Sequence, residues 1–469
     1  MSPFRLVLLP VFHLLTSIAG FTTAYRFDPL EHLGGVAPYF EPHDPPVSSA
    51  PPQGCTPVRA AYLSRHAAIY INDFDYEEYI QPFIAKWQNH TAIDWSKIPS
   101  LSFLARWTAP VSEAEEELLT RMGKLEATEL AISLSFRYPG LKMPQRVWAS
   151  SAERTVKSAQ ALIRGFELEE NTIGLVVIEE SKTTGANSLT PYKSCPAYSP
   201  STGSKQSSVF LKRFAKPIVA RLNALAPSFD FTADDVYGMM ELCGYESVIR
   251  GSSPFCNLDL FSPDEWLAWE YTADIMYHYN TGYGSSVSGV IGLPWFKAAA
   301  DLLMGSNDST NAQDLYVSFT HRELTPTVLV AMGLFNNSEP GGAGCVNKTM
   351  PLDQINHRRA WKSSHIMPFM GNLAIERLAC TGSYGFPDGD YYRALVNNAP
   401  QQLPGCRDGP GTSCSHSSFD AYLQDRVSMF SGFSDKCGVA DDDAPEVLTI
   451  YTDPAVGNGT LVGKRSIWE

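Results

Sequence analysis

Three short segments hold the side chains whose types and spacing could carry out chemistry. They are SRHAAIYI at 64–71, QRVWASSAER at 145–154 and FTHRELTP at 319–326. The candidate residues in them are Arg65, His66, Arg146, Arg154, His321, Arg322 and Glu323. Arginines bind phosphate oxygens and neutralise their charge, a neutral histidine can attack phosphorus, and a carboxylic acid can protonate a leaving alkoxide. This set of residues is therefore typical of phosphoryl transfer.

Each segment lies where a predicted strand ends. The strands are predicted by VRAAYLSRH, QRVWAS and DLYVSFT, and helices by SAERTVKSAQALIRGF and ELTPTVLVAMGLF behind the last two. Ligands of open α/β sheets bind at the carboxyl ends of strands, so we expect the three segments to meet at one site. Pro326, near the start of the last helix, is compatible with a helix N-terminus that faces an anion.

Each residue also has an ordinary structural interpretation. A single histidine at a strand end, His66 or His321 taken alone, is commonly a buried polar group whose hydrogen bonds are satisfied. An arginine on an amphipathic helix, such as Arg154, commonly pairs with an acid. The case for a site therefore depends on the three segments together.

The order of the predicted elements indicates an α/β fold with an inserted helical domain. Strands and helices alternate over 55–180 and 284–440, which predicts a mixed sheet flanked by helices, and 181–283 reads as helices joined by loops. The Pro- and Gly-rich residues 25–54 predict an extended arm, and 441–469 a C-terminal tail.

The charge and the N-terminus restrict where the protein works and what it binds. A net charge of −14 gives no footprint for nucleic acid, so any phosphate pocket must be a local basic cluster. Residues 1–24 have one arginine, a short apolar run and small residues, which predicts a signal peptide; the alternative is an uncleaved anchor. After cleavage we expect no membrane association.

Cysteines and sequons also favour a secreted or extracellular protein. The nine cysteines are dispersed and none forms a CxxC pair, which favours disulfides over a zinc site. N-x-S/T sequons, candidate glycosylation sites, occur at Asn89, Asn307, Asn336, Asn347 and Asn458. The sequence gives no reason to expect a metal or another cofactor, and it leaves the oligomeric state open.

The chain resembles the histidine acid phosphatases, in the branch of secreted acid phosphatases and phytases. The segments RVWASSAERTVKSAQALIRGF, SPFCNLDLFSPDEWLAWEY, VSFTH and YRALVNNAPQQLPGC match that family in order, between about residues 55 and 437. The resemblance implies the phosphoglycerate-mutase-like α/β fold with its helical insertion. It also implies a small-molecule substrate, a phosphate monoester.

The resemblance further implies roles for individual residues. His66 matches the nucleophile that becomes phosphohistidine, Arg65 and Arg146 match phosphate-binding arginines, His321 matches the second phosphate-contacting histidine, and Glu323 stands where one version of the family carries its acid. The family's disulfide scheme implies Cys55–Cys380, Cys195–Cys437, Cys243–Cys256 and Cys406–Cys414, which leaves Cys345 over.

The first motif departs from the family pattern RHGxRxP and leaves two hypotheses. Ala67, Ile69 and Ile71 replace its glycine, second arginine and proline. Arg322, directly after His321, either returns the lost positive charge or points to solvent. The first hypothesis is a secreted phosphomonoesterase that works through a phosphohistidine. The second is a diverged family member without phosphatase activity, either a binding protein or an enzyme reused in a biosynthetic pathway.

Overall fold

The computed structural model describes residues 27–43, 45–166, 172–305, 313–337, 350–441 and 444–462. The predicted signal peptide 1–24, the sequons at Asn307 and Asn347, and Cys345 lie outside these ranges. Among the other sequons, Asn89 and Asn458 are exposed and Asn336 is half-buried. No helix within the described ranges is both long enough and apolar enough to cross a membrane.

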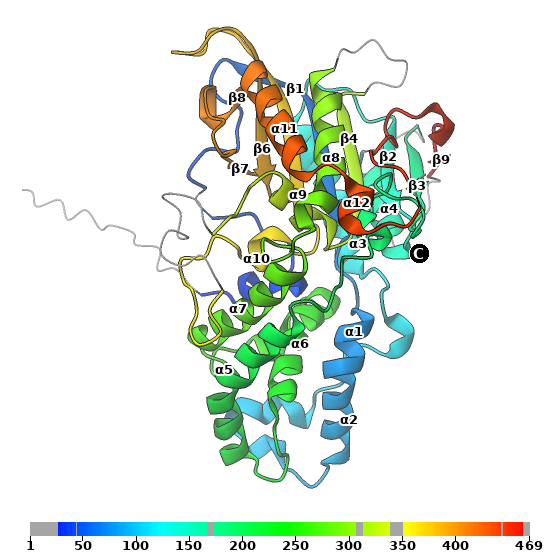
Figure 1. Ribbon diagram of the computed structural model, residues 1–469. Helices are drawn as coiled ribbons and strands as arrows, with labels where there is room; N and C mark the ends of the chain where they lie inside the picture. Colours follow the sequence, from blue (N-terminus) through cyan, green and yellow to red (C-terminus); the bar gives the residue numbers. More distant parts are fainter. Residues whose placement is uncertain are drawn as a thin grey trace, which may run out of the picture.

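A mixed sheet forms the centre of the α/β part, as the sequence predicts (Figure 1). Its order is β7-β6-β5-β1-β4-β2-β3-β9, and β8 pairs with β6. The neighbours β1, β4, β2 and β3 run parallel, and the other pairs are antiparallel. The strands are β1 (Cys55–Arg65), β2 (Arg146–Ser150), β3 (Gly174–Ile178), β4 (Leu315–Thr320), β5 (Asn372–Cys380), β6 (Gly389–Val396), β7 (Ala399–Gln401), β8 (Cys414–Ser415) and β9 (Thr460–Leu461).

Alternate side chains of the central strands pack against helices on both faces of the sheet. On one face, Tyr62 and Phe319 share a core with α3 (Arg121–Arg137) and α4 (Glu153–Phe166). On the other, Leu63 and Tyr316 share a core with α8 (Ser288–Met304), α9 (Leu324–Ala331) and α11 (His416–Phe430). Burial on both faces explains why β2 and β4 are continuous buried runs.

A helical region lies beside the sheet, in the lower part of Figure 1. It contains α5 (Ser204–Leu225), α6 (Ala233–Arg250) and α7 (Pro263–Asn280), which fall within the predicted insertion. It also contains α1 (Asp73–Asp75) and α2 (Gln81–Asn89), which the sequence had placed with the α/β domain. A salt bridge of 2.7 Å between Lys86 and Asp235 joins α2 to α6. The helical region is therefore built from two separate stretches of the chain.

The remaining helices are short. α10 (Ser363–Ile366) precedes β5, and α12 (Phe433–Cys437) follows α11. Short 3₁₀ segments are η1 (Pro29–His32), η2 (Gly34–Val36), η4 (Trp95–Lys97), η5 (Pro99–Ala105), η6 (Glu113–Glu115), η7 (Pro191–Ser194), η8 (Pro254–Cys256), η10 (Pro410–Thr412) and η11 (Pro454–Val456), and η3 (Tyr76–Ile80) is a π-helical segment.

The disulfides and the segment 444–462 join parts of the chain that are distant in sequence. The disulfides are the four that the resemblance implies: Cys55–Cys380, Cys195–Cys437, Cys243–Cys256 and Cys406–Cys414. Residues 444–462 pack on the α/β part instead of forming a loose tail, because β9 pairs with β3 and the Tyr451 hydroxyl lies 2.7 Å from that of Ser318.

Candidate active site

Two histidines meet at the carboxyl edge of the parallel strands. In the β1–β4 register, Arg65 is the partner of Thr320, so His66 and His321 follow side by side. The amide of His66 donates to the Thr320 carbonyl at 2.8 Å, and the two imidazole centroids lie 5.6 Å apart. Both histidines are buried. This is the edge at which the sequence predicts a ligand site.

The ring of His66 is held with one nitrogen free. Its Nδ1 lies 2.9 Å from the Ala67 carbonyl oxygen, which can only accept, so Nδ1 carries the proton and Nε2 keeps its lone pair. Burial, and then the charges of Arg65 and Arg154, hold the pKa of His66 well below its usual range. His66 is therefore a neutral imidazole even in acid, which suits a nucleophile.

His321 is oriented by an acid that the sequence analysis did not identify. Its Nε2 lies 2.8 Å from Glu180 Oε1, and its Nδ1 is buried without a hydrogen-bond partner in the described structure. Burial raises the pKa of Glu180, but hydrogen bonds from His321 and Lys193 outweigh it and keep that pKa below its usual range. Glu180 follows the end of β3, and this position at the shared strand edge is the signal that could have revealed it.

Of the two predicted phosphate-binding arginines on β1 and β2, only Arg65 lies beside the histidines. Its guanidinium carbon lies 4.4 Å from the centroid of Phe369, and its Nη1 donates to the Met367 carbonyl at 2.8 Å. Burial, and then the charge of Arg322, lower its pKa to about 10, so it stays charged in acid. Its charge is one of the causes that lower the pKa of His66.

The structure corrects the assignment of Arg146. Arg146 is the first residue of β2, and at a rise of about 3.3 Å per residue it stands roughly 13 Å from Ser150 at the site end of that strand. Its Nη1 donates to the Gly457 carbonyl at 3.2 Å, and its guanidinium lies over Trp148. It is a structural residue at the opposite edge of the sheet.

Arg154, at the other end of the same motif, lies at the site instead. It follows Glu153 in the first turn of α4 and forms an ion pair with Glu117. Its charge lowers the pKa values of His66, His321 and Glu323. The interpretation of Arg154 as an ion-pair partner is therefore correct, but it is incomplete.

Arg322 points into the molecule, and its side chain is only 21% exposed. Its Nη2 donates to Asn72 Oδ1 at 3.4 Å, and its Nη1 lies 3.9 Å from Asp75 Oδ2. Asp75 in turn accepts a hydrogen bond of 2.5 Å from the Tyr245 hydroxyl. Burial raises the pKa of Asp75, although Arg322 opposes that shift. No local sequence pattern points to Asp75 or Tyr245, because both come from the helical region.

Glu323 occupies the N-cap position of α9 beside Arg322, but its side chain makes no capping hydrogen bond. Its Oε1 lies 3.4 Å from Arg322 Nε. Burial raises the pKa of Glu323, but the charges of Arg322, His321 and Arg154 outweigh it, so the pKa lies below its usual value. Glu323 is therefore protonated only in acid.

The residues that replace the family pattern in the first motif are all buried. Ala67, Ile69 and Ile71 are at most 2% exposed. Ile69 bridges Leu119, and the Ala68 carbonyl accepts from the Thr120 amide at 2.9 Å. The segment is therefore packed tightly behind His66, and Ile69 offers no charge there.

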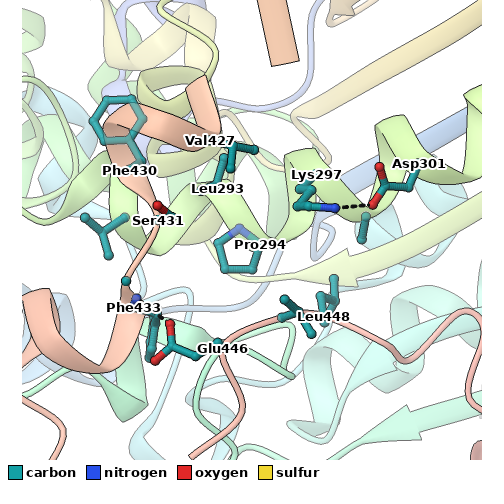
Figure 2. Close-up of a pocket in the computed structure, with 14 residues that line it drawn as sticks. Leu293, Pro294, Lys297, Asp301, Val427, Phe430, Ser431, Phe433, Glu446 and Leu448 are labelled. Carbon is teal, nitrogen blue, oxygen red and sulfur yellow. Dashed lines mark hydrogen bonds and ion pairs between the residues drawn. The ribbon is translucent and has the colours of Figure 1, made fainter. Parts of the chain in front are cut away.

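A separate pocket of about 200 Å³ lies between α8, α11 and residues 446–448 (Figure 2). Its lining is largely apolar, including Leu293, Val427 and Phe430, and the Lys297–Asp301 ion pair of 2.6 Å lies at its edge. None of the residues of the histidine site lines it.

Comparisons with known proteins agree with this geometry. Residues 63–397 match the family model of the histidine phosphatase superfamily (branch 2). An acid phosphatase of Komagataella pastoris is 30% identical over 447 residues, which cover 91% of this chain and 90% of that protein. A thiamine-repressible acid phosphatase of Schizosaccharomyces pombe is 29% identical over 418 residues, covering 85% and 87%. The crystal structure of the phytase from D. castellii shares the fold, with a TM-score of 0.80, 24% identity and 93% coverage of both chains.

Proposed function

The chain belongs to branch 2 of the histidine phosphatase superfamily, and we propose that it is an acid phosphatase that hydrolyses phosphate monoesters through a phosphohistidine at His66. The observation that carries this proposal is the pair of buried imidazoles, 5.6 Å apart, with Nδ1 of His66 fixed on the Ala67 carbonyl. That bond leaves Nε2 as the nucleophilic atom.

In the first step, Nε2 of His66 bonds to phosphorus as the bond from phosphorus to the ester oxygen breaks. Arg65 and Arg154 neutralise the charge on the phosphoryl oxygens, and His321 meets them through its unpartnered Nδ1. Glu323, in its protonated form, gives its proton to the departing alkoxide. The alcohol leaves neutral, and the phosphoryl group remains on His66.

In the second step, Glu323 accepts a proton from a water molecule that attacks phosphorus. The phosphorus–nitrogen bond breaks, inorganic phosphate forms and His66 returns to its neutral state. Arg322 serves as the second positive charge that the first motif lacks at Ile69, because its side chain points inward beside Glu323. No step requires a cofactor.

The substrate class that follows is a small phosphate monoester. Relatives of this chain bear the names acid phosphatase and phytase, which favours the enzyme over the hypothesis of a member without phosphatase activity. Secretion is part of the proposal: the four disulfides suit an oxidising compartment, and Asn89 and Asn458 are exposed enough to carry glycans.

The test is to trap the intermediate. Purified protein is mixed with a ³²P-labelled aryl phosphate at acid pH, quenched in alkali and analysed for acid-labile, alkali-stable label. We expect phosphohistidine in the parent protein and none in the His66→Ala variant. A parent protein that turns over substrate without trapped label on His66, or that neither turns over nor is labelled, would contradict the proposal.

A further inference from the structure

The guanidinium of Arg65 is held by hydrogen bonds at one of its nitrogens, Nη1. Its Nη1 donates to the carbonyl oxygens of Gly35 and Met367, and its plane lies by the ring of Phe369. The Phe369 amide donates to the Ala37 carbonyl at 2.9 Å. The Nε of Arg65 is buried and has no hydrogen-bond partner in the described structure. A buried donor without a partner is costly, so this edge is poised for an acceptor such as a phosphate oxygen.

The Gly35 carbonyl belongs to the N-terminal arm, which is packed tightly against α7. In Figure 1 the deep-blue arm lies beside α7 and α10. Gly34 has φ +55, and a Cβ there would lie 2.7 Å from the Cβ of Ala273; a Cβ on Gly35 would lie 2.9 Å from the Tyr277 hydroxyl. The arm is therefore seated where only glycine fits.

A buried polar chain anchors the arm at this place. The Gly34 amide donates to Ser364 Oγ at 3.0 Å, and Ser364 Oγ donates to Glu270 Oε1 at 2.7 Å. The other Glu270 oxygen accepts from Arg359 Nη2 at 2.8 Å. Ser364, Glu270 and Arg359 are all buried, so each bond is costly to leave unmade.

We propose that the arm is a positioning element of the active site: Ser364 fixes Gly34, and thereby the Gly35 carbonyl that aims Arg65 at the bound phosphate. This inference rests on the proposed function, because it needs phosphate at Arg65. Ser364 and the arm touch no substrate; they act through Arg65 alone. Loosening the arm therefore weakens phosphate binding only while Arg65 is present.

The experiment is a double-mutant cycle read by phosphate binding instead of turnover. The Kd of inorganic phosphate is measured by calorimetry at acid pH for the parent, Ser364→Ala, Arg65→Ala and the double variant. We expect Ser364→Ala to weaken binding by about three- to tenfold, as for one weakened hydrogen bond. In the Arg65→Ala background, the same change should alter Kd less than about twofold, since interactions through a shared residue are not additive.

The matched control is Asp28→Ala, which removes the cap of η1 at the far end of the arm and touches neither Gly34 nor Gly35. It should leave the Kd of phosphate unchanged. Equal losses for Ser364→Ala in both backgrounds, or no loss in either, would overturn the role of the arm while leaving the proposed function intact. A parent protein that binds no phosphate would refute both.

A second variant pair covers the case in which Ser364→Ala does not fold. Gly35→Ala places a methyl group against the Tyr277 hydroxyl and should displace the carbonyl that holds Arg65. Adding Tyr277→Phe removes that hydroxyl, so the double variant should regain at least half of the lost binding free energy. Phosphate affinity that stays at the parent level in Gly35→Ala would contradict the inference.

Discussion

His321 Nε2 and Glu180 Oε1 lie 2.8 Å apart, so an acid that follows β3 orients the second histidine of a site whose first histidine follows β1. Because Glu180 stays ionised, it accepts a hydrogen bond from the Nε2–H of His321 and favours the charged imidazole against the effect of burial. In the proposed reaction, the unpartnered Nδ1 of His321 is then the atom that meets the phosphoryl group.

Glu180→Gln should lower kcat/KM by about ten- to hundredfold, since it replaces a charge-assisted hydrogen bond of roughly 1.5–3 kcal/mol. The pKa of His321 should fall further, because Glu180 raises it against the effect of burial. A lower pH is therefore needed to protonate His321 in this variant. Rate measurements against pH check this expectation.

The control for Glu180 is Lys193→Met. Lys193 Nζ lies 2.5 Å from the other oxygen of Glu180, but its side chain is 41% exposed and does not contact the histidine. We expect this variant to lose less than about threefold, as for an exposed ion pair. Equal losses in both variants would mean that Glu180 acts through the fold and not through His321.

The pH dependence follows from the lowered pKa values of His66, His321 and Glu323. The charged form of His321 is lost as the pH rises through a pKa that burial holds below 6.5. His66 loses its nucleophilic lone pair only when the pH falls through a pKa well below 6.5, so the acid side of the profile lies at low pH. Glu323 loses its proton as the pH rises through a pKa below 4.5, which removes the general acid. Activity toward alkyl phosphates should therefore be greatest in acid and decline toward neutrality.

Substrates with different leaving groups distinguish the loss of activity at low pH from the loss at higher pH. An activated aryl phosphate needs no general acid, so its profile should extend to higher pH than that of an alkyl phosphate. Glu323→Gln should impair the alkyl substrate far more than the aryl one. An alkyl-phosphate optimum above neutral pH, or equal losses on both substrates, would contradict the role of Glu323.

Much of the fold could be predicted from the sequence because local patterns determine it. Buried apolar runs predicted β2 and β4. The location of the site at the carboxyl ends of the strands was predicted from where open α/β sheets bind ligands. Before α3 begins at Arg121, residues 117–120 pair with the segment behind His66. Pairing of this kind depends on tertiary contact and leaves no periodic signal.

The site was predictable where function and strand end coincide, and not elsewhere. His66 and His321 directly follow their strands, and the structure places both at the shared edge. The segment QRVWASSAER has Arg146 near its start and Arg154 at its end. The length of β2 shows that Arg146 is too far from the two histidines, while Arg154 lies near them. Asp75 comes from the helical region, and no local pattern links it to the strands.

Arg154→Met and Arg146→Met should separate these two arginines. Arg154→Met removes a preorganised charge from the phosphoryl group, so kcat should fall by about 10²–10³-fold. Arg146→Met loses the bond to the Gly457 carbonyl and the contact of the guanidinium with Trp148, so it should keep near-parental kcat with a lower melting temperature. Steady-state rates and thermal unfolding measure both. A reversed order of the two losses would restore the family assignment of Arg146.

The pair Arg322 and Asp75 gives the last prediction, because in the proposed site phosphate and Asp75, which lies 3.9 Å from Arg322 Nη1, would compete for the same guanidinium. Arg322→Met should weaken inhibition by inorganic phosphate about tenfold or more, as for the loss of one charged hydrogen bond. At a pH high enough to ionise Asp75, whose pKa is raised by burial, Asp75→Asn should act in the opposite direction and strengthen it, because the counter-charge is removed while the bulk is kept. It should also lower the melting temperature, since a half-buried cation loses its partner.

In the double variant, Asp75→Asn should bring no gain in phosphate inhibition, because the cation that it releases is absent. A gain that persists without Arg322 would show that Asp75 repels phosphate directly, and unchanged inhibition in Arg322→Met would show that Arg322 does not replace the arginine missing at Ile69.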